Sequence, residues 1–152
     1  MNLDSSSRAL LRKLIAEQQV LSLAVLVDAK PVLGLLPYAP LPDFSAVLVH
    51  ASALARHTQG LRPGAPFAIL IHDRVGDPLQ VVRVSFEGEV AAVEKDSAEY
   101  ERGRELFLQR LPDSGVLFTL GDFTMYSLPL RHGRFVQGFA RAADVGADDL
   151  SA

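Results

Sequence analysis

Residues 79–93 read LQVVRVSFEGEVAAV, the clearest signal of a β-strand in the chain. Apolar and polar side chains alternate along it: Val82, Val84, Phe86 and Val90 share one face, and Arg83, Ser85, Glu87 and Glu89 share the other. A period of two residues is typical of a β-strand with one buried face. The stretch therefore predicts a long strand over 79–93 in a protein rich in β-structure.

Shorter β-rich runs flank this strand on both sides. We expect strands at 21–28, 32–39, 45–50, 66–72, 115–120, 122–131 and 134–141. Ala29-Lys30-Pro31 and His132-Gly133 predict tight turns between neighbouring strands. The run at 66–72 is apolar on both faces, which predicts a central strand covered on both sides. Consecutive strands joined by short turns pair antiparallel, and so many in one short chain predict a closed or nearly closed barrel.

Helices are expected at three places among the strands. Apolar residues recur at helical spacing between Leu10 and Ile15, which predicts an amphipathic helix over 5–18. The alanine-rich run at 51–58 favours a short helix by propensity. The capping box at 96–99 predicts a helix that runs to Pro112.

Composition narrows the class of protein. The 152 residues fit one domain, expected over residues 1–142, with a frayed tail at 143–152. The absence of cysteine excludes disulfides, thiolate nucleophiles and cysteine metal sites. A net charge of −3 and scattered arginines argue against partners such as nucleic acid or an anionic membrane. Without a signal-peptide pattern or an apolar run of membrane-spanning length, the sequence predicts a cytoplasmic protein.

Familiar catalytic motifs do not occur in the chain. The glycine-rich dinucleotide loop, the Walker loop, the HExxH zinc pair and the GxSxG serine motif are all missing. The four histidines lack the spacing of metal ligands, so no metal is expected. The sequence identifies no catalytic acid, base or nucleophile.

Two local features of the sequence favour the binding of an anion. At 50–58 a strand is expected to enter a helix whose first turn carries Ser52, and unpaired amides at a helix N-terminus attract negative charge. The alternative is that Ser52 is an ordinary N-cap. Arg83 lies on the polar face of the long strand, where it faces solvent, a partner subunit or an anion.

Five segments resemble a known family, in the same order along the chain. They are 37–39 (PYA), 52–61 (SALARHTQGL), 83–88 (RVSFEG), 122–128 (DFTMYSL) and 138–142 (GFARA). The segment at 52–61 resembles the S-x-L-A-x-H-T-x-N-L element of the FMN-binding split-barrel proteins related to pyridoxamine 5′-phosphate oxidase. Its His57-Thr58 form is most similar to the haem-utilisation branch of that family.

The resemblance implies a fold, a cofactor and a partner. The fold is mainly β (α+β), an antiparallel split β-barrel with Greek-key character, flanked by an N-terminal helix and two inserted helices. The partner is a second copy of the chain, with FMN at the homodimer interface, and the implied activity is that of an oxidoreductase acting on a small-molecule redox substrate. By resemblance, the cofactor-binding residues are Tyr38, Ser52, Arg56, His57, Thr58, Arg83, Gly138 and Phe139, the last two from the partner chain.

The chain also departs from this family. Leu36 stands where a Ser or Thr is common, Gly60 replaces an Asn, and Ala53-Leu54 follow Ser52 where the true oxidases carry Arg and Lys. Fewer cations weaken phosphate binding, which argues against a vitamin B6 oxidase. The alternatives are a haem-binding or haem-degrading protein, although no histidine follows His132, a deazaflavin-binding reductase, and a non-catalytic cofactor-binding module.

Overall fold

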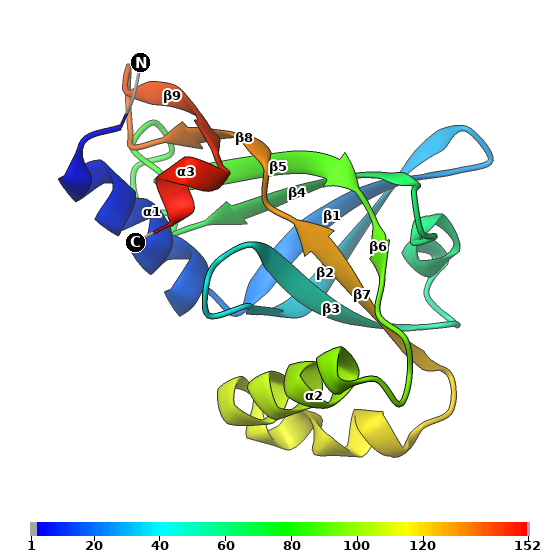
Figure 1. Cartoon of the computed structure of the whole chain (residues 1–152). Coiled ribbons are helices and arrows are strands. Elements are labelled where there is room, and N and C mark those ends of the chain that lie inside the picture. Colours follow the sequence, from blue (N-terminus) through cyan, green and yellow to red (C-terminus); the bar gives the residue numbers. More distant parts are fainter. Residues whose placement is uncertain (1–2, 152) are drawn as a thin grey trace.

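The computed structural model describes residues 3–151, which form a curled antiparallel sheet with helices packed around it (Figure 1). The strands are β1 (Val20–Val27), β2 (Lys30–Pro40), β3 (Ala46–Ser52), β4 (Pro66–His72), β5 (Arg83–Glu89), β6 (Ala91–Ala92), β7 (Phe123–Pro129), β8 (His132–Val136) and β9 (Ala142–Gly146). The helices are α1 (Ser5–Glu17), α2 (Ala98–Arg110) and α3 (Ala147–Leu150), with 3-10 helices η1 (Arg56–Gly60) and η2 (Pro112–Thr119). No helix among the described residues is long and apolar enough to cross a membrane.

The strand order explains the barrel shape. The order is β6-β7-β3-β2-β1-β4-β5-β8-β9, and each paired strand runs antiparallel to its neighbour. Only Val90 separates β5 from β6 along the chain, yet they lie toward opposite edges of the sheet. The chain over 83–92 therefore bends from one half of the sheet to the other and curls it into a split barrel, which confirms the predicted fold class.

Inward side chains of this sheet form the main core. Its largest fully buried members include Tyr38, Phe86 and Phe135. A smaller cluster lies between the sheet and α2, where Phe107 packs with Leu48 and Met125. These two cores place one face of most strands inside, so the opposite faces form the outer surface of the barrel.

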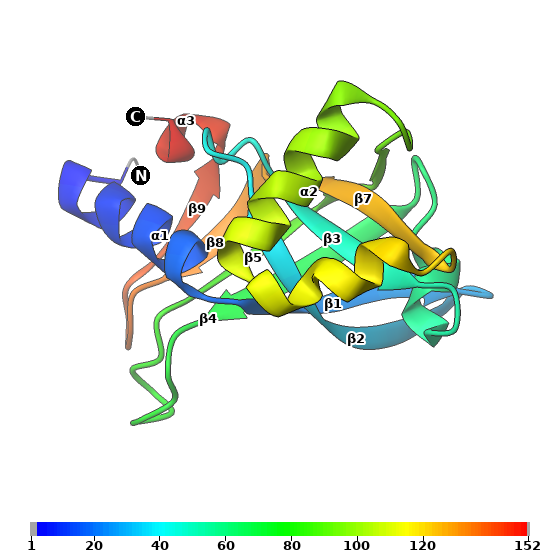
Figure 2. The ribbon, with the colours of Figure 1, turned by 90° about the horizontal axis from the view of Figure 1, so that it is seen from below.

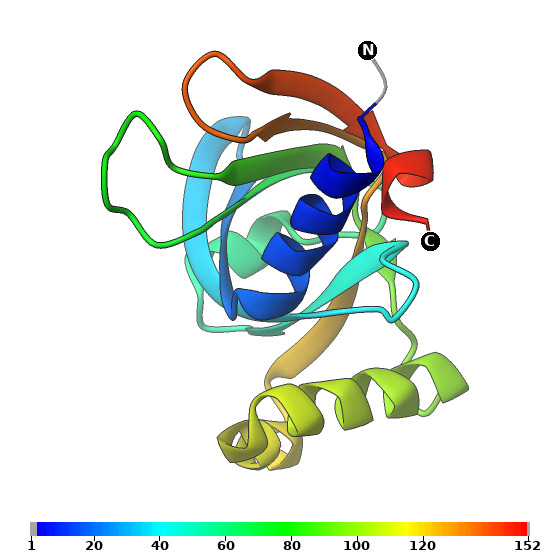
Figure 3. The same ribbon diagram turned by 90° about the vertical axis from the view of Figure 1, so that its left-hand side faces the viewer.

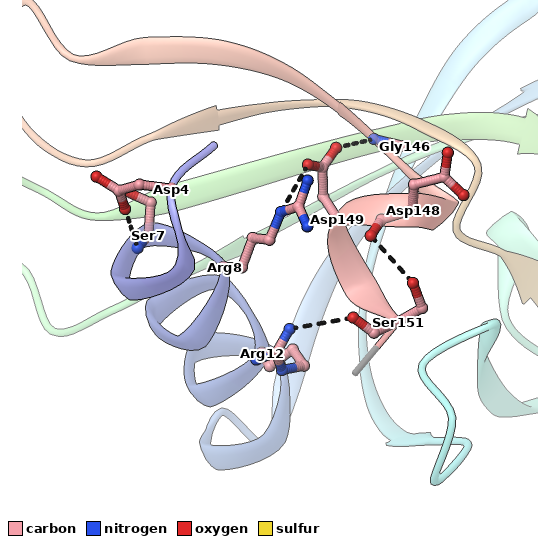
Figure 4. A network of polar contacts seen from close by, with 8 residues as sticks. All are labelled: Asp4, Ser7, Arg8, Arg12, Gly146, Asp148, Asp149 and Ser151. Carbon is pink, nitrogen blue, oxygen red and sulfur yellow. Dashed lines mark hydrogen bonds and ion pairs between the residues drawn. The ribbon is translucent and has the colours of Figure 1, made fainter. Parts of the chain in front are cut away.

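Residues 143–151 of the C-terminal tail are ordered, contrary to the expectation that the tail frays; Ala152 lies outside the described residues. Strand β9 pairs with β8, and α3 lies against α1 (Figure 4). Arg8 of α1 forms an ion pair of 3.4 Å with Asp149, whose carboxylate also accepts a 2.9 Å hydrogen bond from the Gly146 amide. Backbone pairing and this contact hold the tail in place, and neither can be read from its small, acidic composition.

Three predicted strands were partly or wholly wrong. The strand expected over 79–93 begins only at Arg83, because residues 73–82 form a loop closed by a 2.9 Å bond from the Asp73 amide to the Val82 carbonyl. The strand expected at 115–120 is η2, since a short apolar run does not distinguish strand from helix. The strand expected at 134–141 ends at Val136.

Three further local predictions need correction. Residues 51–58 do not form an α-helix; β3 runs on to Ser52, and η1 follows. Strand β4 is central in the sheet, but its side chains alternate between buried and more exposed, so only one face is covered. The expected turn at 132–133 is part of β8. The β1–β2 turn is formed by Asp28 and Ala29, both with positive φ, as a two-residue hairpin turn requires.

Candidate functional site

Tyr38, one of the predicted cofactor residues, lies in the core. It is fully buried, and its hydroxyl donates a 2.6 Å hydrogen bond to the carbonyl of Ile15. The guanidinium of Arg110 covers its ring, 4.9 Å from the ring centroid. The expectation that Tyr38 lines a cleft therefore does not hold for the single chain.

The junction after β3 is a tight turn rather than a helix N-terminus. Ser52 accepts a 3.1 Å hydrogen bond from the Leu54 amide, and its carbonyl accepts one of 2.6 Å from the Thr58 hydroxyl. The Ser52 hydroxyl in turn donates to the carboxylate of Asp122 at 3.1 Å. A phosphate placed at Ser52 would lie beside this negative carboxylate, which disfavours the anion site expected there.

His57 and Arg56 belong to η1, which packs against the β1–β2 hairpin. The His57 ring lies so close to Gly34 that a side-chain carbon at residue 34 would collide with it. Burial lowers the pKa of His57 below its usual value. This ring is held by packing against the sheet, and Arg56 next to it is exposed.

Arg83, Gly138 and Phe139 come together around the loop at 73–82. Gln80 in this loop accepts a 3.4 Å hydrogen bond from the Phe139 amide, and its side chain lies where a Cβ on Gly138 would project. Gly138 has φ +124°, a backbone conformation that other residues rarely adopt. Within the single chain, Gly138 and Phe139 therefore lie beside the loop that precedes Arg83, and their approach to a cofactor of the second subunit stays a prediction.

Arg83 borders a surface hollow at the base of the same loop. The hollow has a volume of about 250 Å³ and is lined by Leu70, His72, Val75, Pro78, Val81 and Arg83. The Arg83 guanidinium donates one 3.0 Å bond to the Val81 carbonyl. Since a guanidinium carries five N–H donors, others remain for an anion.

The predicted residues thus fall into two groups at opposite ends of the barrel. The loop at 73–82 lies at the end of the sheet near α1, beside the loop that carries Phe139, whereas η1 lies at the far end near the β1–β2 turn (Figures 2 and 3). Strand register agrees, because β4 pairs Leu70 with Ser22 near the start of β1 and Phe67 with Val25 near its end. Within one chain the two groups do not form one site.

An open apolar surface covers the outer face of β1 and β2. Leu33 is 77% exposed and Leu35 is 68% exposed, and Val20 and Leu26 of β1 are also largely exposed. Toward β8 and β9 the outer face becomes charged, with a hollow of about 480 Å³ bordered by Glu87, His132 and the Arg134–Asp144 ion pair. Among residues 3–151, no three His, Asp or Glu side chains are grouped to hold a metal ion.

His72 lines the same hollow as Arg83 and was not among the site residues predicted from the sequence. The spacing of the histidines did not single it out. Two signals were nevertheless available: it ends a strand, and it directly precedes a loop rich in Asp, Gly and Pro.

Comparison with known proteins identifies relatives of this chain in sequence and in structure. No protein-family model matches the chain. The chain is 29% identical over 147 residues to the haem oxygenase HutZ of Vibrio cholerae. This alignment covers 88% of the chain and 78% of HutZ. The solved structure of HutZ, described as a haem storage protein, superposes with a TM-score of 0.74 at 22% identity over 86% of the chain and 94% of HutZ. The chain has the split-barrel fold, and its sequence is similar to that of the haem oxygenase HutZ.

Other solved structures share the split barrel. A haem-binding protein from Mycobacterium smegmatis aligns with a TM-score of 0.79 and 24% identity, over 99% of the chain and 61% of that structure. A protein of the pyridoxinephosphate oxidase family from Clostridium acetobutylicum aligns with a TM-score of 0.69 and 10% identity, over 97% and 99% of the two chains. The predicted family resemblance of this split-barrel protein is therefore confirmed.

Proposed function

We propose that this split-barrel protein binds haem on the outer face of its barrel. The observation that carries the proposal is the exposed apolar side chains of β1 and β2, beyond which the same face runs past Ser22 to Leu70 of β4 and the cation Arg83. Haem is a flat, largely apolar ligand with two carboxylates, and it matches a surface that is apolar with a cation at its border. The relationship to HutZ, a haem oxygenase by name, supports haem as the ligand.

The chain's own residues fit this ligand in part. Apolar strand residues supply the surface on which a porphyrin lies, and Arg83 has free donors for a carboxylate. When bound, haem iron would supply the redox chemistry, and the protein would bind and orient the group.

A homodimer completes this proposal. Leu33 and Leu35 project from β2 into solvent, opposite Ala24 and Ser22 of β1, and two such exposed leucines side by side indicate a surface that a partner covers. A second copy of the chain would cover this surface and enclose the bound ligand. Leu35→Arg is expected to shift the protein from dimer to monomer in light scattering. Leu54→Arg, at a 90% exposed leucine outside this face, is the control and should leave the mass unchanged.

FMN is the second candidate ligand, and a flavin oxidoreductase the second candidate function. The free donors of Arg83 favour it, since they suit a phosphate as well as a carboxylate. The resemblance assigns the Ser52 junction to the FMN phosphate. The Ser52 hydroxyl is bonded to the Asp122 carboxylate, whose negative charge disfavours a phosphate there. Haem is therefore the better match to this structure.

Absorption titrations separate the two candidates. Purified protein stripped of ligands is titrated with ferric haem and, separately, with FMN, and saturation of the Soret or flavin band is recorded. Saturable haem binding without FMN binding supports the proposal. Saturable FMN binding with no haem affinity would replace haem by the flavin. If neither ligand binds, both proposed functions are contradicted, and the protein binds neither of the two cofactors.

A further inference from the structure

His72 and Arg83 form a pair on the outer face of the sheet. They are direct partners in the β4–β5 register, at the end of the sheet where the loop at 73–82 begins and ends. Side chains of directly opposed residues in an antiparallel pair project to the same side, with Cβ atoms about 4.5–5.5 Å apart. Both side chains line the 250 Å³ hollow, whose remaining walls are apolar.

The hydrogen bonding of His72 leaves one ring nitrogen available. Its Nδ1 lies 2.7 Å from the carbonyl oxygen of Asp73. A carbonyl can only accept, so Nδ1 carries the proton and Nε2 keeps its lone pair in the neutral ring. Histidines that ligate metals commonly donate their second nitrogen to a carbonyl in this way, which fixes the ring and its tautomer.

The other histidines are less suited to bind iron. His50 is buried and stacked on Phe118, and His57 is packed against Gly34. His132 is exposed, but it lies opposite Glu87 in the sheet, in a hollow where Arg134 is paired with Asp144 and leaves the Glu87 carboxylate uncompensated. Negative charge there would repel the carboxylates of haem.

The charged groups near His72 are compatible with the binding of a haem carboxylate in the hollow. Arg83 faces it across the strands. The acidic neighbours in the loop are Asp73 and Asp77, and both carboxylates accept backbone hydrogen bonds, from Arg74 at 2.7 Å and Leu79 at 3.0 Å. These bonds partly compensate the acidic charge.

We infer that His72 binds the iron of haem through Nε2 and that Arg83 binds a haem carboxylate in the same hollow. This inference rests on the proposed function. The hollow is smaller than the roughly 300–1,000 Å³ of enclosed ligand sites. It therefore seats one part of the ligand, and the rest lies across the outer face of β1 and β2, where the proposed function places the porphyrin.

The test compares ferric haem binding by the 152-residue chain and three variants. His72→Ala is expected to lower haem affinity at least 10-fold and to lose the spectrum of an imidazole-ligated haem, and added imidazole should restore that spectrum. His132→Ala, the matched control at an exposed histidine, should bind like the wild type. Arg83→Ala should weaken binding about 10-fold without changing the spectrum, because it removes a charge-assisted bond and not the iron ligand.

The outcomes distinguish the inference from the function on which it rests. Wild-type protein that binds no haem would overturn both. Wild-type protein that binds haem while His72→Ala keeps the wild-type affinity and spectrum would overturn the inference alone. Because His72 is exposed, its removal should leave the melting temperature unchanged, and circular dichroism melts verify that each variant is folded.

Discussion

The hydroxyl of Tyr38 donates a 2.6 Å hydrogen bond to the carbonyl of Ile15, in the last turn of α1. Carbonyls in the last turn of a helix have no partner within the helix. Arg110 at the end of α2 donates a 2.6 Å bond to the next carbonyl, that of Ala16, and covers the Tyr38 ring. Burial raises the pKa of Tyr38 to about 12, so the hydroxyl keeps its proton and remains a donor. These bonds attach α1 to β2 and α2.

Tyr38→Phe tests this attachment. The substitution leaves the ring in place but removes the donor from a buried carbonyl, which should lower the free energy of unfolding by about 1–2 kcal/mol. Urea denaturation monitored by circular dichroism measures the change. Tyr126→Phe is the control, because the described residues give its hydroxyl no hydrogen bond, and it should cost less than about 0.5 kcal/mol. Equal effects of the two substitutions would contradict the assigned role.

The sequence allowed the regular parts of this fold to be predicted because their signals are local. The helix expected over 5–18 is α1 at Ser5–Glu17, begun by an N-cap bond from the Ser7 amide to Asp4. The capping signal at 96–99 was also effective, since the Ser97 hydroxyl accepts from the Tyr100 amide and α2 follows. The hairpin at 20–40 follows from alternation and a short turn.

The arrangement of the candidate site could not be predicted in the same way. Ser52 and Arg83 belong to one family pattern along the chain, but the barrel places them at opposite ends. Motif order does not report distance across a sheet. The contact of Asp122 with Ser52 joins residues 70 positions apart, and nothing local to either residue indicates it. For the same reason the ordered tail was missed, since its stability depends on β8 and α1.

Gly34 makes a close approach that should tolerate no side chain. A Cβ at this position would collide with the ring of His57, so Gly34→Ala should destabilise the protein by about 1–3 kcal/mol. Gly76→Ala is the control, because nothing lies within 4 Å of a Cβ there. In a double-mutant cycle, His57→Ala should recover most of the loss. Additive costs would show that the strain lies elsewhere.

The contact between Arg8 and Asp149 should stabilise the tail measurably. Asp149 is only 15% exposed and bonds both Arg8 and the Gly146 amide (Figure 4), so Asp149→Ala should cost about 1–2 kcal/mol in thermal or urea unfolding. The Arg134–Asp144 pair is the matched control, since it is well exposed, and Asp144→Ala should change stability little. Faster amide exchange of β9 in Asp149→Ala would locate the effect. A larger loss in Asp144→Ala would contradict this ranking.

His50 should make the fold sensitive to acid. Its ring stacks 4.2 Å from that of Phe118 and lies 5.1 Å from that of Phe123, and its buried Nδ1 has no hydrogen-bond partner among the described residues. Burial lowers the pKa of His50 to about 4 from 6.5, so below pH 6.5 the unfolded chain binds a proton that the folded chain does not. The stability that depends on neutral His50 is therefore complete above pH 6.5 and is lost between pH 6.5 and 4, with a slope of at most about 1.4 kcal/mol per pH unit. His50→Phe keeps an aromatic ring in the cluster and should flatten this decline in urea denaturation from pH 7 to 5, whereas His132→Gln should follow the wild type. The decline in the free energy of unfolding should not vanish, because burial also lowers the pKa of His57.

Parallel curves of unfolding free energy against pH for His50→Phe and the wild type would show that the acid sensitivity arises from other groups.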